Sequence, residues 1–499
     1  MNHTKKQIIL LMTDATRQDM LGCYGNPQMH TPNLDALAES GTRFQNAYTC
    51  QPVCGPARSA IFTGTYPHSN GGITNCVPLG ANVKTIGQRL SDQGIRTAYI
   101  GKWHLDGGDY FGLGRCPDGW DPEYWYDMRC YLEELTEEER LFSRSHAANR
   151  QGVSADFTYA YRCADRATDF LQKHGDEDFF LTVSLDEPHD PSLCPEPYAS
   201  MFQEYEFPKS PNVWDTLEGK PLYQKYWAGE GIKTDRDRVK LMAPAYLGCN
   251  AFADSQLGRV IDCIKSCAPD AMIIYTSDHG DGLGSHCLHG KGASIYNEIA
   301  RVPLLIAGAG LPRGIINRHP VSHINLPALV MDYMGLPIPR CFEGKSLLEE
   351  IRRPEVRTND YIVTEFTRYE IDHDGFGGLQ MMRAIYDGRY KLAVHLLDPI
   401  DEFYDQEQDP YEMKNLIWDE TYDAEKTRLH KLLLEWMNAT RDPFRGYQWE
   451  QRPWRKDAQT PTWSYTGCTR QRENEEYEPR QLDYSTGLPM ESAVRKKSP

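Results

Sequence analysis

The sequence contains no long apolar run and no excess of positive charge. No stretch of its 499 residues approaches the roughly 20 apolar residues that a membrane-spanning helix needs. The first residues, Met1–Lys6, lead directly into a short apolar segment, without the apolar stretch and small-residue cleavage site of a signal peptide. The formal net charge of −17 disfavours nucleic acid and anionic membranes as partners. We therefore expect a cytoplasmic protein that binds neither nucleic acid nor membrane.

The cysteines form no Cys-x-x-Cys pair, although the chain contains 14 of them. Two pairs have a wider spacing, Cys50 with Cys54 and Cys263 with Cys267. This spacing disfavours a structural zinc site. In a chain without a secretion signal, we expect most of these thiols to be reduced and buried.

Short apolar runs alternate with amphipathic segments along most of the chain. The expected strands are Gln7–Thr13, Thr97–Gly101, Phe179–Ser184, Met272–Thr276 and Val302–Ile306. The expected helices are Pro32–Glu39, Val83–Gln93, Ala155–Lys173 and Ala245–Ser266. Strands that are apolar on both faces and alternate with helices are typical of a parallel sheet. The pattern predicts an α/β fold with a large, doubly wound, mostly parallel sheet flanked by helices.

Polar residues gather directly after the expected strands. They are Asp14, Lys102, His104, Asp186–His189, Asp278 and His279. In open α/β sheets, ligands bind outside the carboxyl ends of the strands. We expect the functional site at this edge.

The pattern changes beyond residue 355. Three short strands (Tyr361–Phe366, Met381–Tyr386 and Arg389–Val394), with a tight turn at Asp387-Gly388, predict an antiparallel sheet, and Thr421–Thr440 predicts one helix. We expect a catalytic domain at residues 1–355, a smaller α+β subdomain at 356–440 and an extended tail at 441–499 that packs on the surface.

Cys54 precedes a predicted helix start. Pro56 suits the first helical turn, Ala57–Thr63 is expected to be helical, and Gly64 is a plausible stop. Residue 54 would then lie at the positive end of the helix dipole, which favours an anion. Arg58, one turn further on, can bond oxygens there through its planar, always charged fork.

The run Cys54-Gly55-Pro56-Ala57-Arg58 followed by Thr63-Gly64 resembles the signature at which sulfatases have a cysteine oxidised to Cα-formylglycine. The resemblance covers nearly the whole chain and extends to Leu21–Asn26, Thr31–Asp35, Gly101–His104, Tyr404-Asp405, Asp409–Glu412 and Asn415-Leu416. It is closest to bacterial sulfatase-like proteins without a signal peptide. It implies the alkaline phosphatase superfamily fold and an arylsulfatase-like sulfuric ester hydrolase. A hydrated aldehyde can attack sulfur with one hydroxyl and later expel sulfate through the other, which a sulfated thiol does not do easily.

The resemblance also implies a metal site. Asp14, Asp278 and His279 match the sulfatase metal positions, and residue 54 would add an oxygen of its diol. Many sulfatases have a second Asp where this chain has Ala15, and Asn where it has His279. Calcium is the expected divalent cation because hard cations prefer oxygen ligands, and manganese or another transition ion is the alternative.

Five further residues take roles by the same resemblance. Lys102 would bond the diol and a sulfate oxygen, and His104 would be the base that drives collapse to the aldehyde. Lys291 would hold sulfate and the leaving-group oxygen. His189 would be the general acid that protonates the departing alcohol, a role that suits imidazole at neutral pH. Asn75 would donate to the sulfate.

Two alternatives stay open. A phosphonate monoester or phosphodiester hydrolase of the same superfamily is favoured by Ala15 and His279, and disfavoured by the presence of Lys102 and His104. A non-catalytic binding protein is disfavoured by the complete set of metal, base and acid positions. The implied partners are a small sulfated substrate, such as a sulfated sugar, and a maturation enzyme that oxidises Cys54 in the unfolded chain.

Overall fold

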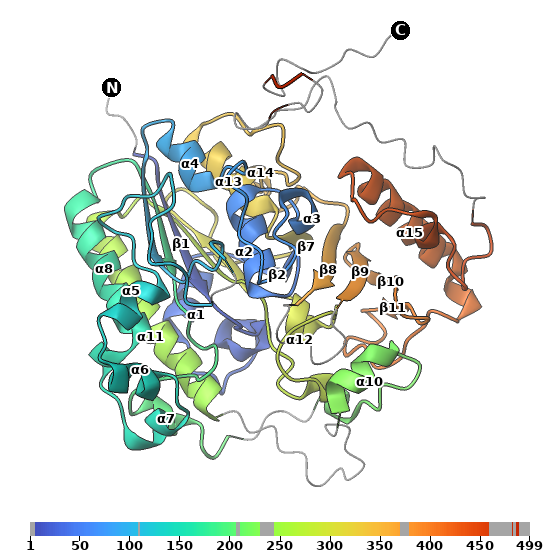
Figure 1. Ribbon diagram of the computed structural model, residues 1–499, viewed down its shortest axis with the longest axis horizontal. Coiled ribbons are helices and arrows are strands. Elements are labelled where there is room, and N and C mark those ends of the chain that lie inside the picture. Colours follow the sequence, from blue (N-terminus) through green and yellow to red (C-terminus); the bar gives the residue numbers. More distant parts are fainter. Residues whose placement is uncertain are drawn as a thin grey trace.

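The computed structural model describes residues 5–107, 110–205, 210–229, 244–369 and 379–458, together with 482 and 486–488. Two sheets organise this part of the chain (Figure 1). The seven-stranded sheet has the order β3-β4-β1-β5-β6-β2-β7, and the four-stranded sheet has the order β11-β10-β9-β8. The strands of the large sheet are β1 (Gln7–Thr13), β2 (Gly41–Tyr48), β3 (Arg96–Gly101), β4 (Phe179–Ser184), β5 (Met272–Ser277), β6 (Leu304–Ala307) and β7 (Ile315–Ser322).

The large sheet is mostly parallel. Strand β1 pairs in parallel with β4 and β5, β3 with β4, and β2 with β7, whereas β6 runs antiparallel to both of its neighbours. The expected α/β fold class is therefore confirmed. Strands β2 and β7 were not predicted, because their sequences GTRFQNAY and IINRHPVS mix polar and apolar residues and are buried only in part.

Helices cover both faces of this sheet. Along β1, Ile9 and Leu11 contribute to one core, and Ile8, Leu10 and Met12 to the other, as expected for alternating side chains. The first core is closed by α1 (Pro32–Glu39), α5 (Met128–Glu133), α8 (Tyr159–His174) and α11 (Pro244–Cys267). The second is closed by α2 (Cys54–Thr63), α4 (Ile86–Ser91), α13 (Asn325–Met334) and α14 (Leu348–Arg352).

Helices α4 and α8 begin after capping residues, and these starts differ from the ones that the apolar pattern of the sequence predicted. Helix α4 begins after Thr85, whose side chain accepts from the Gln88 N–H while the Gln88 side chain accepts from the Thr85 N–H. The expected helix Val83–Gln93 was therefore too long. Helix α8 begins after its cap Thr158, and residues 155–157 form a separate 3-10 turn.

The four-stranded sheet is antiparallel and is covered by one long helix. Its strands are β8 (Ile362–Arg368), β9 (Leu379–Tyr386), β10 (Tyr390–His395) and β11 (Glu402–Asp405), and the helix is α15 (Asp423–Ala439). Figure 1 shows α15 lying beside this sheet. The antiparallel sheet and its helix were expected, except for β11. Trp449 and Trp454 are buried in the same core, and most of the expected tail beyond residue 458 lies outside the described residues.

The remaining described helices are short. They are α3 (Pro67–Asn70), α6 (Glu137–Ser143), α7 (Ala147–Gln151), α9 (Tyr198–Met201), α10 (Leu222–Ala228), α12 (Asn297–Ala300) and α16 (Tyr447–Glu450). Within the described ranges, no helix has the length and apolar character needed to cross a membrane.

Candidate active site

The carboxyl ends of the two central strands place three polar side chains together. Strand β1 ends at Thr13 and is followed by Asp14, while β5 ends at Ser277 and is followed by Asp278 and His279. Thr13 is paired directly with Ser277, so the two loops leave the sheet side by side. All three polar side chains are fully buried.

The next two strands add positive charge to the same edge. Gly101 ends β3 opposite Ser184 of β4, and its φ of +124° together with a Cβ position only 1.9 Å from the Ser184 oxygen requires glycine. Lys102 follows, donates its N–H to Ser184 O at 2.8 Å, and places its ammonium 2.8 Å from Asp14 Oδ2 and 3.0 Å from Asp186 Oδ1. The local chain path therefore directs Lys102 toward Asp14.

Helix α2 brings Cys54 to this edge. Cys54 is the first residue of the helix, and Gly64 ends it with a left-handed φ of +73°. The N–H of Gly55 donates to Asn75 Oδ1 at 2.9 Å, which holds the first turn and leaves the amide nitrogen of Asn75 for other partners. Residue 54 thus lies at the N-terminus of a buried helix, where negative charge is favoured.

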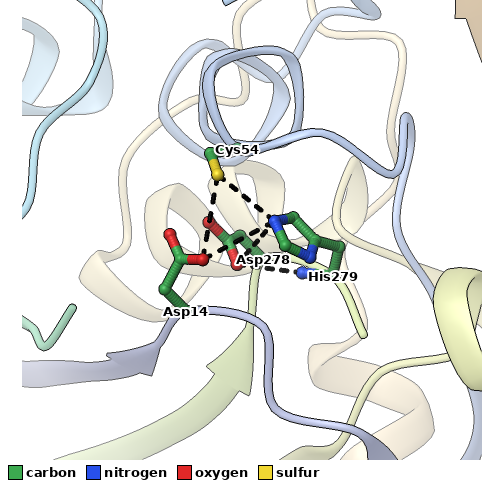
Figure 2. Close-up of side chains that lie close together, drawn as sticks. All are labelled: Asp14, Cys54, Asp278 and His279. Carbon is green, nitrogen blue, oxygen red and sulfur yellow. Dashed lines mark hydrogen bonds and ion pairs between the residues drawn. The ribbon is translucent and has the colours of Figure 1, made fainter. Parts of the chain in front are cut away.

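Four side chains converge on one small volume. Figure 2 shows Asp14, Cys54, Asp278 and His279 pointing toward one another, and their potential ligand atoms all lie within 4.8 Å. The His279 Nε2 atom lies 3.3 Å from Cys54 Sγ, 3.6 Å from Asp14 Oδ1 and 3.7 Å from Asp278 Oδ1. These are the residues that the sequence placed at the metal.

The atoms that face away from this volume are held by other groups. Arg58 donates to Asp278 Oδ2 at 3.0 Å and to Asp14 Oδ2 at 3.3 Å, which leaves both Oδ1 atoms directed at the centre. His279 contacts Gly280 O through Nδ1 at 2.7 Å, so the lone pair of Nε2 faces inward. Orientation of ligands by outer partners is usual in metal sites.

The donor set fits a divalent cation. Burial and the charge of Asp14 raise the pKa of Asp278 to about 6, because two carboxylates share one dry volume. A cation between them would relieve this repulsion. Two carboxylate oxygens suit calcium, whereas the imidazole nitrogen also suits manganese or another transition ion. Ala15, with a φ of +63°, offers only its N–H, which donates to Asp278 Oδ1 at 3.3 Å.

The volume also stabilises negative charge on residue 54. Burial and Asp14 oppose ionisation of the thiol, but Lys102, Lys291 and His279 outweigh them and hold the pKa of Cys54 well below its usual range. The Lys291 ammonium lies 2.6 Å from Cys54 Sγ. The ammonium groups of Lys102 and Lys291 would also stabilise an oxyanion at this position.

Two histidines flank residue 54. His104 is buried and hydrogen-bonds to Cys54, and burial lowers the pKa of its imidazole below the ordinary value, which favours the neutral form that can accept a proton. His189 is partly exposed, and its Nε2 lies 3.1 Å from Lys291 Nζ and 4.0 Å from Asp14 Oδ1. His189 therefore stands between the interior of the site and solvent.

All the residues singled out from the sequence lie around this volume, but the sequence did not identify Tyr110 or Arg144 beside it. Tyr110 donates to Asp186 Oδ1 and contacts His189, while Arg144 lies over the Tyr110 ring. Asp186 stood out only as one of several polar residues after a strand. The strand end was a usable signal for Asp186, whereas Tyr110 and Arg144 follow no strand and depend on tertiary packing.

The fold and the site define an α/β protein with a cysteine at the N-terminus of a buried helix and a group of potential metal ligands at the carboxyl edge of a mostly parallel sheet. The sulfatase family model matches residues 6–336, and the model of the C-terminal part of N-sulphoglucosamine sulphohydrolase matches residues 284–439. The chain belongs to the sulfatase family and is a sulfatase enzyme.

Individual relatives agree with this assignment. The uncharacterised sulfatase YidJ of Escherichia coli K12 is 41% identical over 493 residues, which cover 97% of both chains. N-acetylglucosamine-6-O-sulfatase of Bacteroides thetaiotaomicron is 24% identical over 88% of this chain and 87% of its own.

Solved structures show the same fold. A protein in complex with its substrate D-glucosamine-2-N,6-O-disulfate has a TM-score of 0.73 at 22% identity, covering 88% of this chain and 99% of its own. The phosphonate monoester hydrolase of Agrobacterium radiobacter has a TM-score of 0.71 at 23% identity, covering 87% and 96%. The architecture is therefore shared across hydrolases of different esters.

Proposed function

We propose that this sulfatase hydrolyses a sulfate monoester of a small molecule, with a sulfated sugar as the favoured class. The observation that carries the proposal is the convergence of Asp14, Asp278, His279 and residue 54, with the ammonium of Lys291 2.6 Å from Cys54 Sγ. The sugar is suggested by relatives whose names specify sugar sulfatases.

A modified residue and a metal ion complete the proposed chemistry. When present, a hydrated formylglycine made from Cys54 supplies a nucleophile that can release sulfate again, and a divalent cation, calcium first, neutralises the sulfate oxygens. Asp14, Asp278 and His279 would hold the cation with residue 54, while Arg58 keeps both carboxylates oriented.

The remaining residues bind the sulfate and move protons. Lys102 and Lys291 flank residue 54 and would hold the sulfate oxygens, with the Asn75 amide as a further donor. His104 would accept a proton from residue 54 through the nitrogen that faces it. His189 would give a proton from Nε2 to the leaving alcohol oxygen.

The cellular setting follows from the same proposal. We assign the protein to the cytoplasm, where a small imported substrate would reach it and a separate maturation enzyme would oxidise Cys54 before folding. We also propose a division into a catalytic domain (1–355), an α+β subdomain (356–440) and a surface tail (441–499).

The test compares matured and unmatured protein. The chain is produced with and without a formylglycine-generating enzyme, the conversion is measured by the mass of the peptide that contains residue 54, and hydrolysis is measured on p-nitrophenyl sulfate and a panel of sulfated mono- and disaccharides. Activity should rise with the converted fraction and be absent from Cys54→Ala. Full activity in Cys54→Ala would overturn the proposal.

A phosphonate monoester or phosphodiester hydrolase is the second candidate. It is favoured by Ala15, which offers an N–H and no carboxylate to the metal site, and by the imidazole of His279 among the ligands. Lys102 and His104 argue against it. Faster turnover of a phenylphosphonate monoester than of the matched aryl sulfate by the matured protein would establish the second candidate.

A further inference from the structure

Tyr110 connects two groups of the candidate site through one hydroxyl. Its Oη donates to Asp186 Oδ1 at 2.5 Å and lies 3.1 Å from His189 Nδ1. A carboxylate only accepts hydrogen bonds, so the single hydroxyl proton of Tyr110 is committed to Asp186. The lone pairs of Oη are then free to accept from His189, and the order of donation is Nδ1–H to Oη and Oη–H to Oδ1.

This order fixes the roles of the two His189 nitrogens. Nδ1 faces Tyr110 Oη and the backbone oxygen of Asp190, both at 3.1 Å. Nε2 faces the opposite way, toward Lys291 Nζ at 3.1 Å and Asp14 Oδ1 at 4.0 Å. Since both groups on the Nδ1 side can only accept from it, Nε2 is the nitrogen that can exchange a proton with a ligand.

Asp186 links this arrangement to the sulfate-binding side. Its Oδ1 accepts from Tyr110 and also from Lys102 Nζ at 3.0 Å. The Lys102 ammonium in turn lies 3.9 Å from the centre of the Tyr110 ring. The hydroxyl and the ring face of Tyr110 therefore serve two different contacts, which a substitution can separate.

We propose that Tyr110 is a positioning residue for the general acid His189, and that its hydroxyl, held by Asp186, orients the imidazole so that Nε2 faces the ligand. The proposal rests on the proposed function, because it assumes that His189 protonates a leaving group. The Asp190 carbonyl also holds Nδ1, but among the described residues Tyr110 is the one that connects this nitrogen to a carboxylate.

The test compares two sulfate esters whose leaving groups differ in their need for a proton. An aryl sulfate with a nitro substituent leaves as a stable phenolate and needs little protonation, whereas a sugar alcohol needs a proton as the ester bond breaks. A residue that positions the acid should therefore matter for the sugar sulfate and hardly for p-nitrophenyl sulfate. A residue that only supports the fold should affect both esters alike.

The experiment uses matured protein with Tyr110→Phe, which keeps the ring and its contact with Lys102 and removes only the hydroxyl. We expect kcat on a sulfated monosaccharide to fall about 10- to 100-fold, toward the lower range of general acid effects, with KM and the rate on p-nitrophenyl sulfate little changed. The matched control is Tyr124→Phe, because Tyr124 Oη likewise lies 3.1 Å from a histidine nitrogen, Nε2 of His174 on α8, which is not part of the candidate site. This control should leave both substrates unchanged.

Two further variants keep the test decisive. Asp186→Asn weakens the acceptor of the Tyr110 hydroxyl and also removes a charge that Lys102 contacts, so it should slow both esters and slow the sugar sulfate more, even if Tyr110→Phe folds poorly. In a His189→Ala background, Tyr110→Phe should have no additional effect on the sugar sulfate. An equal loss on both esters, or no loss on the sugar ester, would overturn the proposal. If the unmutated matured protein hydrolyses no sulfate ester at all, the proposed function fails first, and this result is distinct from the other two.

Discussion

The Nζ atom of Lys291 lies 2.6 Å from the Sγ atom of Cys54, although the two residues are 237 positions apart in the chain. The Asp281 carboxylate holds the loop that presents the lysine, because its Oδ1 atom accepts from the N–H groups of Leu283 and Gly290. The lysine therefore acts from a fixed loop and need not be recruited by substrate. Preorganised charge of this kind loses little to reorganisation during a reaction.

Lys291→Met should lower kcat/KM of the matured enzyme by about 100- to 1,000-fold, the usual effect of removing one preorganised donor at a developing charge. The side chain keeps a similar length, so folding should be unaffected. Steady-state kinetics and circular dichroism check both statements. Lys265→Met, an exposed lysine on α11, is the control and should change nothing. A loss of less than tenfold in Lys291→Met would contradict the assigned role.

Arg58→Lys should destabilise the unmodified chain. The guanidinium bonds Asp14, Asp278, Ser184 Oγ and the Lys102 carbonyl, all without solvent. A lysine ammonium carries three donors on one atom and cannot reach all four acceptors, so at least one buried oxygen loses its partner. We expect a loss of about 1 to 3 kcal/mol, the cost of leaving a buried polar group without its hydrogen-bond partner.

Urea denaturation at one pH measures this loss. The conservative control is Arg353→Lys in the exposed pair with Glu349, which should change stability by no more than about 0.5 kcal/mol. Equal stability of Arg58→Lys and the unmutated chain would contradict the prediction, because it would show that water or the lysine replaces the hydrogen bonds of the guanidinium.

The sequence was sufficient for the part of the site that follows buried strands. Asp14, Lys102 and Asp278 each come directly after an apolar run, and parallel strands bring their carboxyl ends to one edge. Tyr110 could not be found this way, since it does not directly follow a strand and its partner Asp186 is 76 residues away, beyond helices α5 to α8 and strand β4. Strands β2 and β7 were missed because their sequences mix polar and apolar residues and are buried only in part.

His279→Asn should shift the ion preference toward calcium. Imidazole nitrogen suits transition ions, and an amide oxygen suits hard cations. In the unmutated chain, Nε2 points into the ligand volume, 3.7 Å from Asp278 Oδ1. Isothermal titration measures the dissociation constants of Ca²⁺ and Mn²⁺. The dissociation constant of Mn²⁺ divided by that of Ca²⁺ should be at least about tenfold higher in the variant than in the unmutated chain.

Asp278→Asn provides the control for that experiment. It removes one carboxylate and should weaken both ions together without changing their ratio much. A ratio unchanged by His279→Asn would mean that the imidazole is not a ligand. The unmutated chain should also melt at a higher temperature once it is loaded with the ion, and a chelator should reverse this rise. The reason is that a ligand bound only to the folded state stabilises that state.

Glu187 should make the folded protein less stable as pH rises. Its carboxyl is buried between Asp186 and the start of α8, where Oε1 accepts from the Ala160 N–H at 2.9 Å and Oε2 has no partner among the described residues. Burial, with the charge of Asp186, raises its pKa from 4.5 to about 8. Between these values the unfolded chain has lost its proton and the folded chain has kept it, so the free energy of unfolding falls with rising pH. The loss levels off above the folded pKa.

Glu187→Gln removes this titration and keeps the acceptor for Ala160. The difference in unfolding free energy between variant and unmutated chain should grow in favour of the variant by about 1.4 kcal/mol for each pH unit inside that window, the free energy equivalent of one pKa unit. Urea denaturation at pH 5, 6, 7 and 8 of the unmodified chain measures the slope. Glu137→Gln, an exposed carboxylate at the start of α6, is the control and should follow the unmutated chain. Parallel curves for Glu187→Gln and the unmutated chain would show that the Glu187 carboxyl ionises normally in the folded protein.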